Sequence, residues 1–364
     1  MKIISFYLPQ YHEVTENNEW WGKGFTEWVN VKNSIPRFKG HQQPRIPLNK
    51  NYYDLTDSKS LKWQADLAKE YGIYGFCYYH YWFEGHLLLE KPAEIMLQDK
   101  SIELPFCFCW ANHTWRRTWA NKHKTVLLEQ TYGDKEDWEN HFNYFLPFFK
   151  DDRYIKNNEK PMLVIYNPSS IDRLEEMLSL WNQLALENGL NGISYSYQEN
   201  AYATVDTPTS NMFDYGIEYQ PSRALEVINK SSSSIIKRTT NRIADAIPIL
   251  RSRWTTLTYD YDKVWKCILN QQPLSNKSIP GAFVDWDDSP RRKNRGSVSL
   301  GVTPGKFKKY LSQQIRRTKE VYQKDMLFVF AWNEWGEGGY LEPDELHNYK
   351  MLEAVREALQ ENEE

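Results

Sequence analysis

Short apolar runs alternate along the chain with segments of helical periodicity. Eight runs have the length and composition of buried strands: Ile3–Leu8, Tyr74–Tyr81, Pro105–Ala111, Met162–Tyr166, Ile193–Tyr197, Asp214–Tyr219, Ala282–Asp285 and Leu327–Trp332. Between them, apolar residues recur every three or four positions, which predicts helices over 58–71, 135–150, 172–188, 306–322 and 345–359. This alternation predicts an α/β fold, a single (β/α)₈ TIM barrel over residues 1–364.

Two segments interrupt the regular alternation. The connection after the first strand, from Pro9 to about Asp57, is too long for a simple loop, and in a barrel it would build part of the active face. The segment Ser222–Trp254 carries seven basic and two acidic residues, and we expect an insertion after the sixth strand. This insertion either contacts an anionic membrane surface or packs on the barrel as an ordinary solvated segment. A doubly wound sheet is the alternative fold, but no glycine-rich phosphate-binding loop follows any predicted strand.

Composition and charge narrow the class of protein. The chain has 45 basic and 48 acidic residues, and a formal charge of −3 argues against a nucleic-acid-binding protein. No uncharged run approaches the ~18 residues of a spanning helix, and no secretion signal is recognisable. We therefore expect a cytoplasmic protein, with the inner face of the membrane as a further location. The four cysteines lack metal-ligand spacing, and no cofactor or metal is expected.

The strongest chemical signal is a pair of carboxylates after the last predicted strand. Glu334 and Glu337 lie in the run Ala331–Gly338, at the end of a barrel strand where catalytic groups are found. We expect Gly336 to let the chain turn, so that both side chains reach one cavity. Paired carboxylates are typical of glycoside cleavage, in which one donates a proton and the other acts as base or nucleophile. The alternative is a loop with two solvated glutamates.

A second acidic run follows the seventh predicted strand. Asp285 and Asp287 flank Trp286, and we expect both to neighbour the glutamates, where they could bind sugar hydroxyls or modulate a glutamate pKa. Structural capping just before Pro290 is an equally good account of part of this run. Glu27 and Glu218, near other strand ends or loops, serve as comparison carboxylates, and Glu218 is also a candidate for substrate binding.

Aromatic and amide side chains gather near further strand ends. Aromatic rings can stack on the C–H faces of a pyranose while amides and imidazoles bind its hydroxyls, as in a partly apolar ligand pocket. An ordinary aromatic core is the alternative. A metal site at His80, Glu84 and His86 is not favoured. The remaining candidates for substrate binding are Tyr7, Tyr79, His80, Trp110, Asn112, Trp115, Trp286, Trp332 and Asn333.

Four blocks of the sequence resemble one family. They are 6–12 (FYLPQYH), 20–28 (WWGKGFTEW), 41–45 (HQQPR) and 332–338 (WNEWGEG), and they look like the WbsX-like proteins related to glycoside hydrolase family 99. The resemblance spans nearly the whole chain. It implies a role in O-antigen or capsule (lipopolysaccharide) biosynthesis, where members are commonly described as glycosyltransferases. The related hydrolases are (β/α)₈ enzymes that act on mannose-type substrates without a metal and retain configuration.

The resemblance also implies roles for the glutamate pair. Glu334 occupies the place of the base that takes a proton from the substrate's own 2-hydroxyl, which gives a 1,2-anhydro sugar. Glu337 occupies the place of the acid. This would be a substrate-assisted departure from the usual scheme of two carboxylates. Gly336 stands where the hydrolases usually have His.

Two functional hypotheses follow. The first is a carbohydrate-active enzyme of surface-polysaccharide biosynthesis that cleaves or transfers a glycosidic bond, with an oligosaccharide or polysaccharide partner that could be lipid-linked. Water as acceptor makes it a hydrolase and a sugar hydroxyl makes it a transferase; the sequence alone favours neither. The second is a non-catalytic glycan-binding protein on a degenerate barrel.

Overall fold

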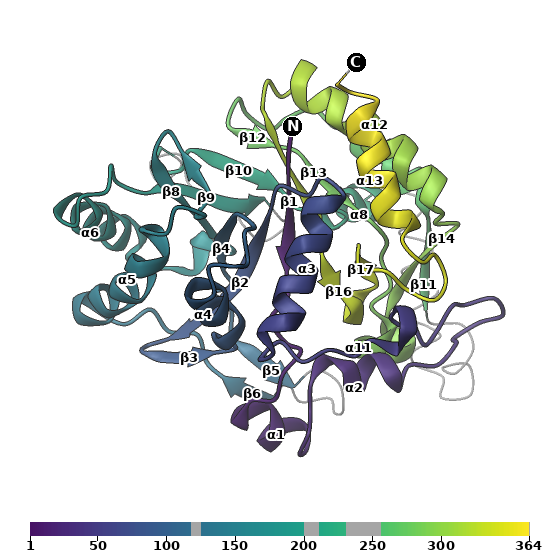
Figure 1. Ribbon diagram of the computed structural model, residues 1–364, viewed down its shortest axis with the longest axis horizontal. Helices are drawn as coiled ribbons and strands as arrows, with labels where there is room; N and C mark the ends of the chain where they lie inside the picture. Colours follow the sequence, from purple (N-terminus) through teal and green to yellow (C-terminus); the bar gives the residue numbers. More distant parts are fainter. Residues whose placement is uncertain (118–124, 200–210, 231–255, 364) are drawn as a thin grey trace.

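The computed structural model describes residues 1–117, 125–199, 211–230 and 256–363. Its centre is a sheet of nine parallel strands that curls into a nearly closed barrel (Figure 1). In spatial order these strands are β12 (Ser278–Ile279), β10 (Tyr215–Glu218), β9 (Ser194–Glu199), β8 (Lys160–Ile165), β4 (Phe106–Trp110), β2 (Gly75–Phe83), β1 (Lys2–Tyr7), β15 (Met326–Phe330) and β13 (Gly281–Phe283).

The barrel closes at a strand that is interrupted by a proline. β12 pairs with β10, and β13 pairs with β15 on the other side. The two segments follow one another across Pro280, which has no N–H to donate but accepts a hydrogen bond from Phe328 N through its carbonyl. Together they supply the seventh strand of an eightfold arrangement. The predicted (β/α)₈ fold is confirmed, with the eight predicted runs as its wall.

Helices surround this wall. Those covering the sheet between successive strands are α3 (Ser58–Glu70), α4 (Lys91–Gln98), α5 (Lys135–Phe149), α6 (Leu174–Glu187), α8 (Ser222–Lys230), α10 (Tyr261–Asn270), α12 (Pro304–Glu320) and α13 (Lys350–Gln360). The five predicted helices are all present. The last begins later than predicted, because Asp344 accepts hydrogen bonds from Tyr340 Oη and His347 N and holds the preceding segment in turns.

The two irregular segments differ in how much the structure describes. The first connection folds into α1 (Thr15–Trp21), α2 (Glu27–Lys32) and a 3₁₀ turn (Leu48–Lys50) before α3. Of the basic segment, α8 is described, and residues 231–254 lie outside the described residues. No helix in the described part of the chain is long and apolar enough to cross a membrane.

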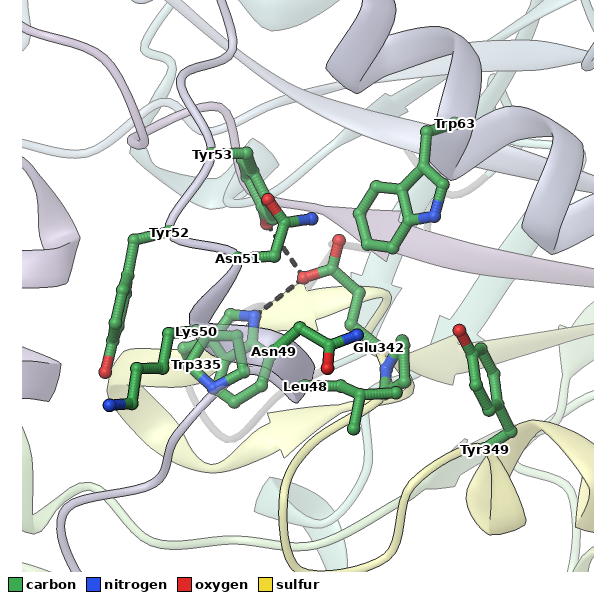
Figure 2. Close-up of a pocket in the computed structure, with 12 residues that line it drawn as sticks. Leu48, Asn49, Lys50, Asn51, Tyr52, Tyr53, Trp63, Trp335, Glu342 and Tyr349 are labelled. Carbon is green, nitrogen blue, oxygen red and sulfur yellow. Dashed lines mark hydrogen bonds between the residues drawn. The ribbon is translucent and has the colours of Figure 1, made fainter.

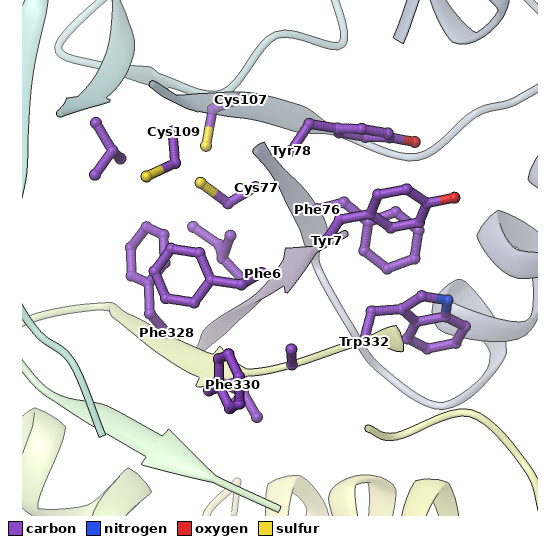
Figure 3. Packing of buried hydrophobic residues seen from close by; sticks show 14 of the residues in the cluster. Phe6, Tyr7, Phe76, Cys77, Tyr78, Cys107, Cys109, Phe328, Phe330 and Trp332 are labelled. Atoms are coloured by element: carbon purple, nitrogen blue, oxygen red, sulfur yellow. The ribbon is translucent and has the colours of Figure 1, made fainter. Parts of the chain in front are cut away.

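Side chains of the wall alternate between the barrel interior and the helices. Figure 3 shows Phe6 beside Phe328 and Cys77, whereas Tyr7 lies on the opposite side with Phe76. The Tyr7 hydroxyl donates to Gln64 of α3, so its side faces the helices and the Phe6 side faces the interior. This alternation decides which strand residues can reach a site inside the barrel mouth. All four cysteines are free thiols.

Gly281 provides the prediction for this architecture. A Cβ at this position would overlap the carbonyl oxygen of Glu218, where β13 approaches the end of β10. Gly281→Ala should therefore lower the free energy of unfolding by about 1–3 kcal/mol, the usual cost of overpacking. Gly305→Ala is the matched control, because no atom outside its own stretch of helix lies within 4 Å of its Cβ position. Urea unfolding measures both, and an unchanged midpoint for Gly281→Ala would contradict this account of barrel closure.

Candidate active site

A tight turn after β15 carries the two predicted catalytic glutamates. The chain passes through β16 (Asn333–Glu334), a 3₁₀ turn (Trp335–Glu337) and β17 (Gly339–Tyr340), which pairs back on β16. Gly336 lies inside the 3₁₀ turn, as expected, and the left-handed backbone that ends the turn is at Gly338, at φ +68°. Gly336 matters for space instead, because a Cβ there would overlap Glu27 Oε1 and lie 2.7 Å from Arg291 Nε.

One guanidinium joins both glutamates. Arg291 lies in α11 (Ser289–Arg292), which follows β13. Its Nη2 is 2.8 Å from Glu334 Oε1, and its Nη1 is 2.9 Å from Glu337 Oε1. Its Nε is 2.8 Å from Oε1 of a third carboxylate, Glu27 at the start of α2. Both carboxylates thus contact Arg291, and Glu27 belongs to the same cluster although it was chosen as a comparison residue.

The two glutamates differ in their surroundings. The Glu334 side chain is 5% exposed and that of Glu337 is 22% exposed, so Glu337 is the more open to a ligand. Burial raises the pKa of Glu334 well above its ordinary value; Arg291 opposes this shift, and the charges of Glu337 and Glu27 add to it. A carboxylate with a raised pKa binds protons more strongly, so Glu334 is a better base once ionised.

Tyrosine and tryptophan rings surround the carboxylates. Burial raises the pKa of Tyr219 well above its ordinary value, and the charges of Glu337 and Glu334 add to the shift. Tyr219 also interacts with the hydroxyl of half-buried Tyr79, which lies stacked on a core phenylalanine. Tyr81 has its pKa raised by burial and by the charge of Glu334, and its ring contacts Trp115. The structure thus brings the predicted residues Tyr79 and Trp115 to the same end of the barrel as the pair.

Trp286 also lies on this side. Its ring is 5.7 Å from that of Phe330, and Phe330 in turn contacts Tyr219 at 5.4 Å. The indole Nε1 donates to Ser297 Oγ, which fixes the plane of the ring. A half-buried indole held in one orientation is suited to stacking on a sugar.

The two predicted aspartates hold the first connection in place. Asp285 accepts a hydrogen bond from Arg45 Nη2 at 2.7 Å. Asp287 Oδ2 lies 2.7 Å from His41 Nε2 and accepts from Gln43 Nε2 at 2.6 Å. The aspartates were expected to lie near the glutamates. The backbone of Asp287 does so, because its N–H donates to the carbonyl of Glu337 at 2.7 Å. Their carboxylates anchor the 41–45 segment beside the turn that carries Glu334 and Glu337.

The turn is fixed from its other side as well. Asn333 Oδ1 accepts from Leu8 N, and Asn333 Nδ2 donates to Leu8 O, so this predicted substrate-binding residue joins the ends of β1 and β15. Trp335 Nε1 donates to buried Glu342 at 2.6 Å, as does Tyr53 Oη at 2.8 Å (Figure 2). This region borders a separate cavity of about 530 Å³, lined by residues 47–53, Trp63, Trp335, Glu342, Pro343 and Tyr349.

Two predicted residues lie on the helix side of the wall. Tyr7 is bonded to Gln64, and Trp332 packs against Phe76 with ring centroids 4.9 Å apart (Figure 3). Both are buried beneath α3, and the structure does not bring them to the glutamates. They were predicted because they lie near the end of a strand. That position is common to residues that face the barrel interior and residues that face the helices.

Three further predicted residues, His80, Trp110 and Asn112, lie on the helix side of strands β2 and β4 or at their ends. His80 Nε2 is 2.9 Å from Nε2 of His141 in α5, and burial lowers the pKa of His80 to about 3. Trp110 packs on the same His141. Asn112 exchanges hydrogen bonds with the backbone of Asn167 and so joins the ends of β4 and β8. These contacts give all three a structural role in this conformation.

Glu218 also points away from the pair. Its carboxylate pairs with Arg223 of α8 at 2.5 Å and accepts from Tyr322 Oη at 2.9 Å, outside the wall. The next residue, Tyr219, is the one that faces the glutamates. Sequence reasoning missed Tyr219, Tyr81, Arg291 and Glu27. Strict alternation along each strand could have pointed to the tyrosines, but no local signal connects Arg291 with Glu27.

No group of three or more histidine, cysteine or acidic side chains in the described ranges could hold a metal ion. The side chains described around the pair are carboxylates, one guanidinium and phenols. This set can move protons and stabilise positive charge.

Comparison with known proteins places the chain in a family. A family model described as Glycosyltransferase WbsX matches residues 3–355. The WxcX proteins of two strains of Xanthomonas campestris pv. campestris, whose function is uncharacterised, are each 34% identical over 360 residues. The matched region covers 98% of this chain and 49% of WxcX, so the chain spans about half the length of these relatives.

Solved structures share the fold. The glycoside hydrolase family 99 endo-α-mannosidase from Bacteroides thetaiotaomicron has a TM-score of 0.56 at 13% identity, covering 99% of this chain and 96% of the mannosidase. A protein described as glycoside hydrolase-like has a TM-score of 0.56 at 12% identity, covering 98% and 93%. At these identities the likeness shows the barrel architecture alone. From the match over residues 3–355 and the relatives at 34% identity, the chain belongs to the WbsX glycosyltransferase family.

Proposed function

We propose that this protein cleaves or transfers a glycosidic bond during the biosynthesis of a bacterial surface polysaccharide, with Glu334 and Glu337 as its catalytic residues. The observation that carries the proposal is the convergence of both carboxylates on Arg291 at the carboxyl end of the barrel strands. Half-buried Tyr79, Tyr219 and Trp286 near the pair supply surfaces for a sugar ring. Membership of the WbsX family supports the polysaccharide setting.

The roles follow from the resemblance and from the environment of each residue. Glu334, buried and with a raised pKa, takes the proton of the substrate's 2-hydroxyl. The freed oxygen forms a bond to the anomeric carbon as the glycosidic C–O bond breaks, and Glu337 donates its proton to the leaving oxygen. An acceptor hydroxyl then gives its proton to Glu337 and attacks the anomeric carbon, while O2 recovers its proton from Glu334. Two inversions give net retention.

The charge of the cluster bears on the kind of donor. One guanidinium and three carboxylates carry a net charge of −2 when all are ionised, and of −1 when Glu337 holds the proton that it donates. Negative charge stabilises the positive charge that develops at the anomeric carbon of an oxocarbenium-like transition state. It repels a departing phosphate. The cluster therefore favours a bond between two sugars over a bond between sugar and phosphate, with mannose-type glycans as the first substrates to test.

The acceptor and the cellular setting are further parts of the proposal. A sugar hydroxyl as acceptor would give transfer, in keeping with the family's description, and water would give hydrolysis. A lipid-linked glycan at the inner face of the membrane fits such a role. In α8 the basic residue Arg223 is paired with Glu218, so it contributes to the barrel and not to a membrane-facing charge.

The first test separates the two catalytic residues. Glu337→Gln should lower kcat by about 10²–10⁴-fold on a neutral oligosaccharide, because its leaving group needs a proton. An activated aryl glycoside or glycosyl fluoride leaves without much help, so turnover of these should be partly rescued, although the second step still lacks the base. Glu334→Gln should abolish both reactions, because the base is needed whatever leaves. The measurement is product release by mass spectrometry, with exposed Glu103→Gln as the matched control.

Different outcomes separate the alternatives. A glycan that stays unchanged with wild type while binding measurably would indicate a glycan-binding protein. Equal loss on both substrates in Glu337→Gln would remove the acid role from that residue. Full activity of Glu334→Gln would place the catalytic base elsewhere.

The second test concerns the donor. Wild-type protein is incubated with an acceptor and either a neutral mannose-type oligosaccharide or a nucleoside-diphosphate sugar. The net negative cluster predicts a kcat/KM at least about 10²-fold higher for the oligosaccharide, a preference of roughly 2.7 kcal/mol. Chromatography of the products measures both rates. A preference for the nucleotide sugar would contradict the charge argument and leave the roles of the two glutamates open.

A further inference from the structure

The catalytic pair depends on a residue that neither acts as an acid nor as a base. Arg291 is the one described cation that contacts Glu334 and Glu337, and each contact uses a different nitrogen of the guanidinium. Because the guanidinium is planar and its donors have fixed directions, two such contacts set the distance between the carboxylates and their orientation. A residue with this geometry can determine how the pair is presented to a substrate.

Glu27 holds this guanidinium from the other side. Its carboxylate is bonded to Arg291 Nε at 2.8 Å, and its side chain is 3% exposed. It comes from the first connection, 264 positions away in sequence. A buried carboxylate that occupies the third donor prevents the guanidinium from rotating toward solvent. Glu27 therefore anchors Arg291. Among the described residues, no hydrogen bond joins Glu27 directly to Glu334 or Glu337.

Gly336 makes room for this arrangement. It lies between the two catalytic glutamates in the turn, and a Cβ there would overlap Glu27 Oε1. The same Cβ would lie 2.7 Å from Arg291 Nε and 3.0 Å from Arg291 Cζ. The space that a side chain would occupy at position 336 is filled by the Arg291–Glu27 ion pair. Any larger residue must displace one of the two.

We propose that Arg291, anchored by Glu27 and admitted by the absence of a side chain at Gly336, is the positioning residue of this site. It holds the carboxylates of Glu334 and Glu337 at a fixed distance and orientation. It also keeps the buried carboxylate of Glu334 able to ionise. The proposal rests on the proposed function for its kinetic consequence, but the ion-pair arrangement also has a consequence for stability that needs no substrate.

The electrostatic consequence has a definite sign. Burial raises the pKa of Glu334, and Arg291 is the group that opposes the rise. Loss of Arg291 should therefore move this pKa still higher, so that the base ionises only at higher pH. The charged and titratable groups that face Glu334 from the surrounding elements are Arg291, Glu337, Glu27, Tyr11, Tyr81 and Tyr219.

The experiment compares Arg291→Met with Arg291→Lys, Gly336→Ala and the control Arg316→Met, which changes an exposed arginine of α12. Arg291→Met should lower kcat by about 10²-fold, as expected when catalytic groups lose their alignment, with a smaller change in KM. The acidic limb of the pH profile of kcat should move to higher pH. Arg291→Lys should return the limb toward its wild-type position and restore only part of kcat, because an ammonium cannot reproduce the planar contacts. Gly336→Ala should shift the limb in the same direction as Arg291→Met.

Thermal stability across pH provides a readout without substrate. A carboxyl whose folded-state pKa is raised contributes stability below its unfolded-state pKa and loses it as pH rises toward the folded-state value. Arg291→Met should therefore lose Tm more steeply than wild type as pH rises from about 5 to 8, and adding Glu334→Gln should reduce that slope. If wild type turns over no glycan but these slopes appear, the proposed function fails and the positioning arrangement stands. Two results would overturn the inference. One is a Tm profile of Arg291→Met that runs parallel to that of wild type across pH. The other is an acidic limb of kcat that stays in its wild-type position in active Arg291→Met and Gly336→Ala.

Discussion

A guanidinium buried among three carboxylates constrains everything around the mouth of this barrel. The Arg291 guanidinium loses much of its hydration when it contacts Glu27, Glu334 and Glu337. The ion pairs offset this desolvation cost only when the carboxylates are held in good geometry. The fold supplies that geometry from α2, α11 and the turn after β15. Removing one partner leaves an uncompensated buried charge, so these three elements depend on one another.

The first connection between strand and helix is part of the same constraint. Residues of its 41–45 segment bind Asp285 and Asp287, and Glu27 of the same connection binds Arg291. The acidic run after β13 thus anchors this connection beside the turn that carries Glu334 and Glu337. A long connection that is rich in polar and aromatic residues is held in place because these partners all follow β13, at the carboxyl end of the barrel strands.

The fold was predictable because each strand and helix carries its own local pattern. The closeness of Glu334 to Glu337 was predictable because both residues lie in one short run. The rest depended on information that is not local. Tyr79 and Tyr81 face the glutamates, whereas His80 between them faces α5. Which side of the strand a residue points to therefore decides whether it can reach the site, and closeness to a strand end does not. Tyr219 and Glu218 show the same division. The Arg291–Glu27 contact joins residues 264 positions apart, and each of them alone resembles any other charged residue between two barrel strands.

The central claim is that Glu334 and Glu337 act together on one glycosidic bond with assistance from the substrate's own hydroxyl. The measurement that tests it most directly is the anomeric configuration of the first-formed product, followed by proton NMR during turnover of a neutral glycan of known linkage. The account predicts retention, because the anomeric carbon is inverted twice. Inversion would show that a single displacement occurs, and the assigned roles of the two glutamates would be wrong.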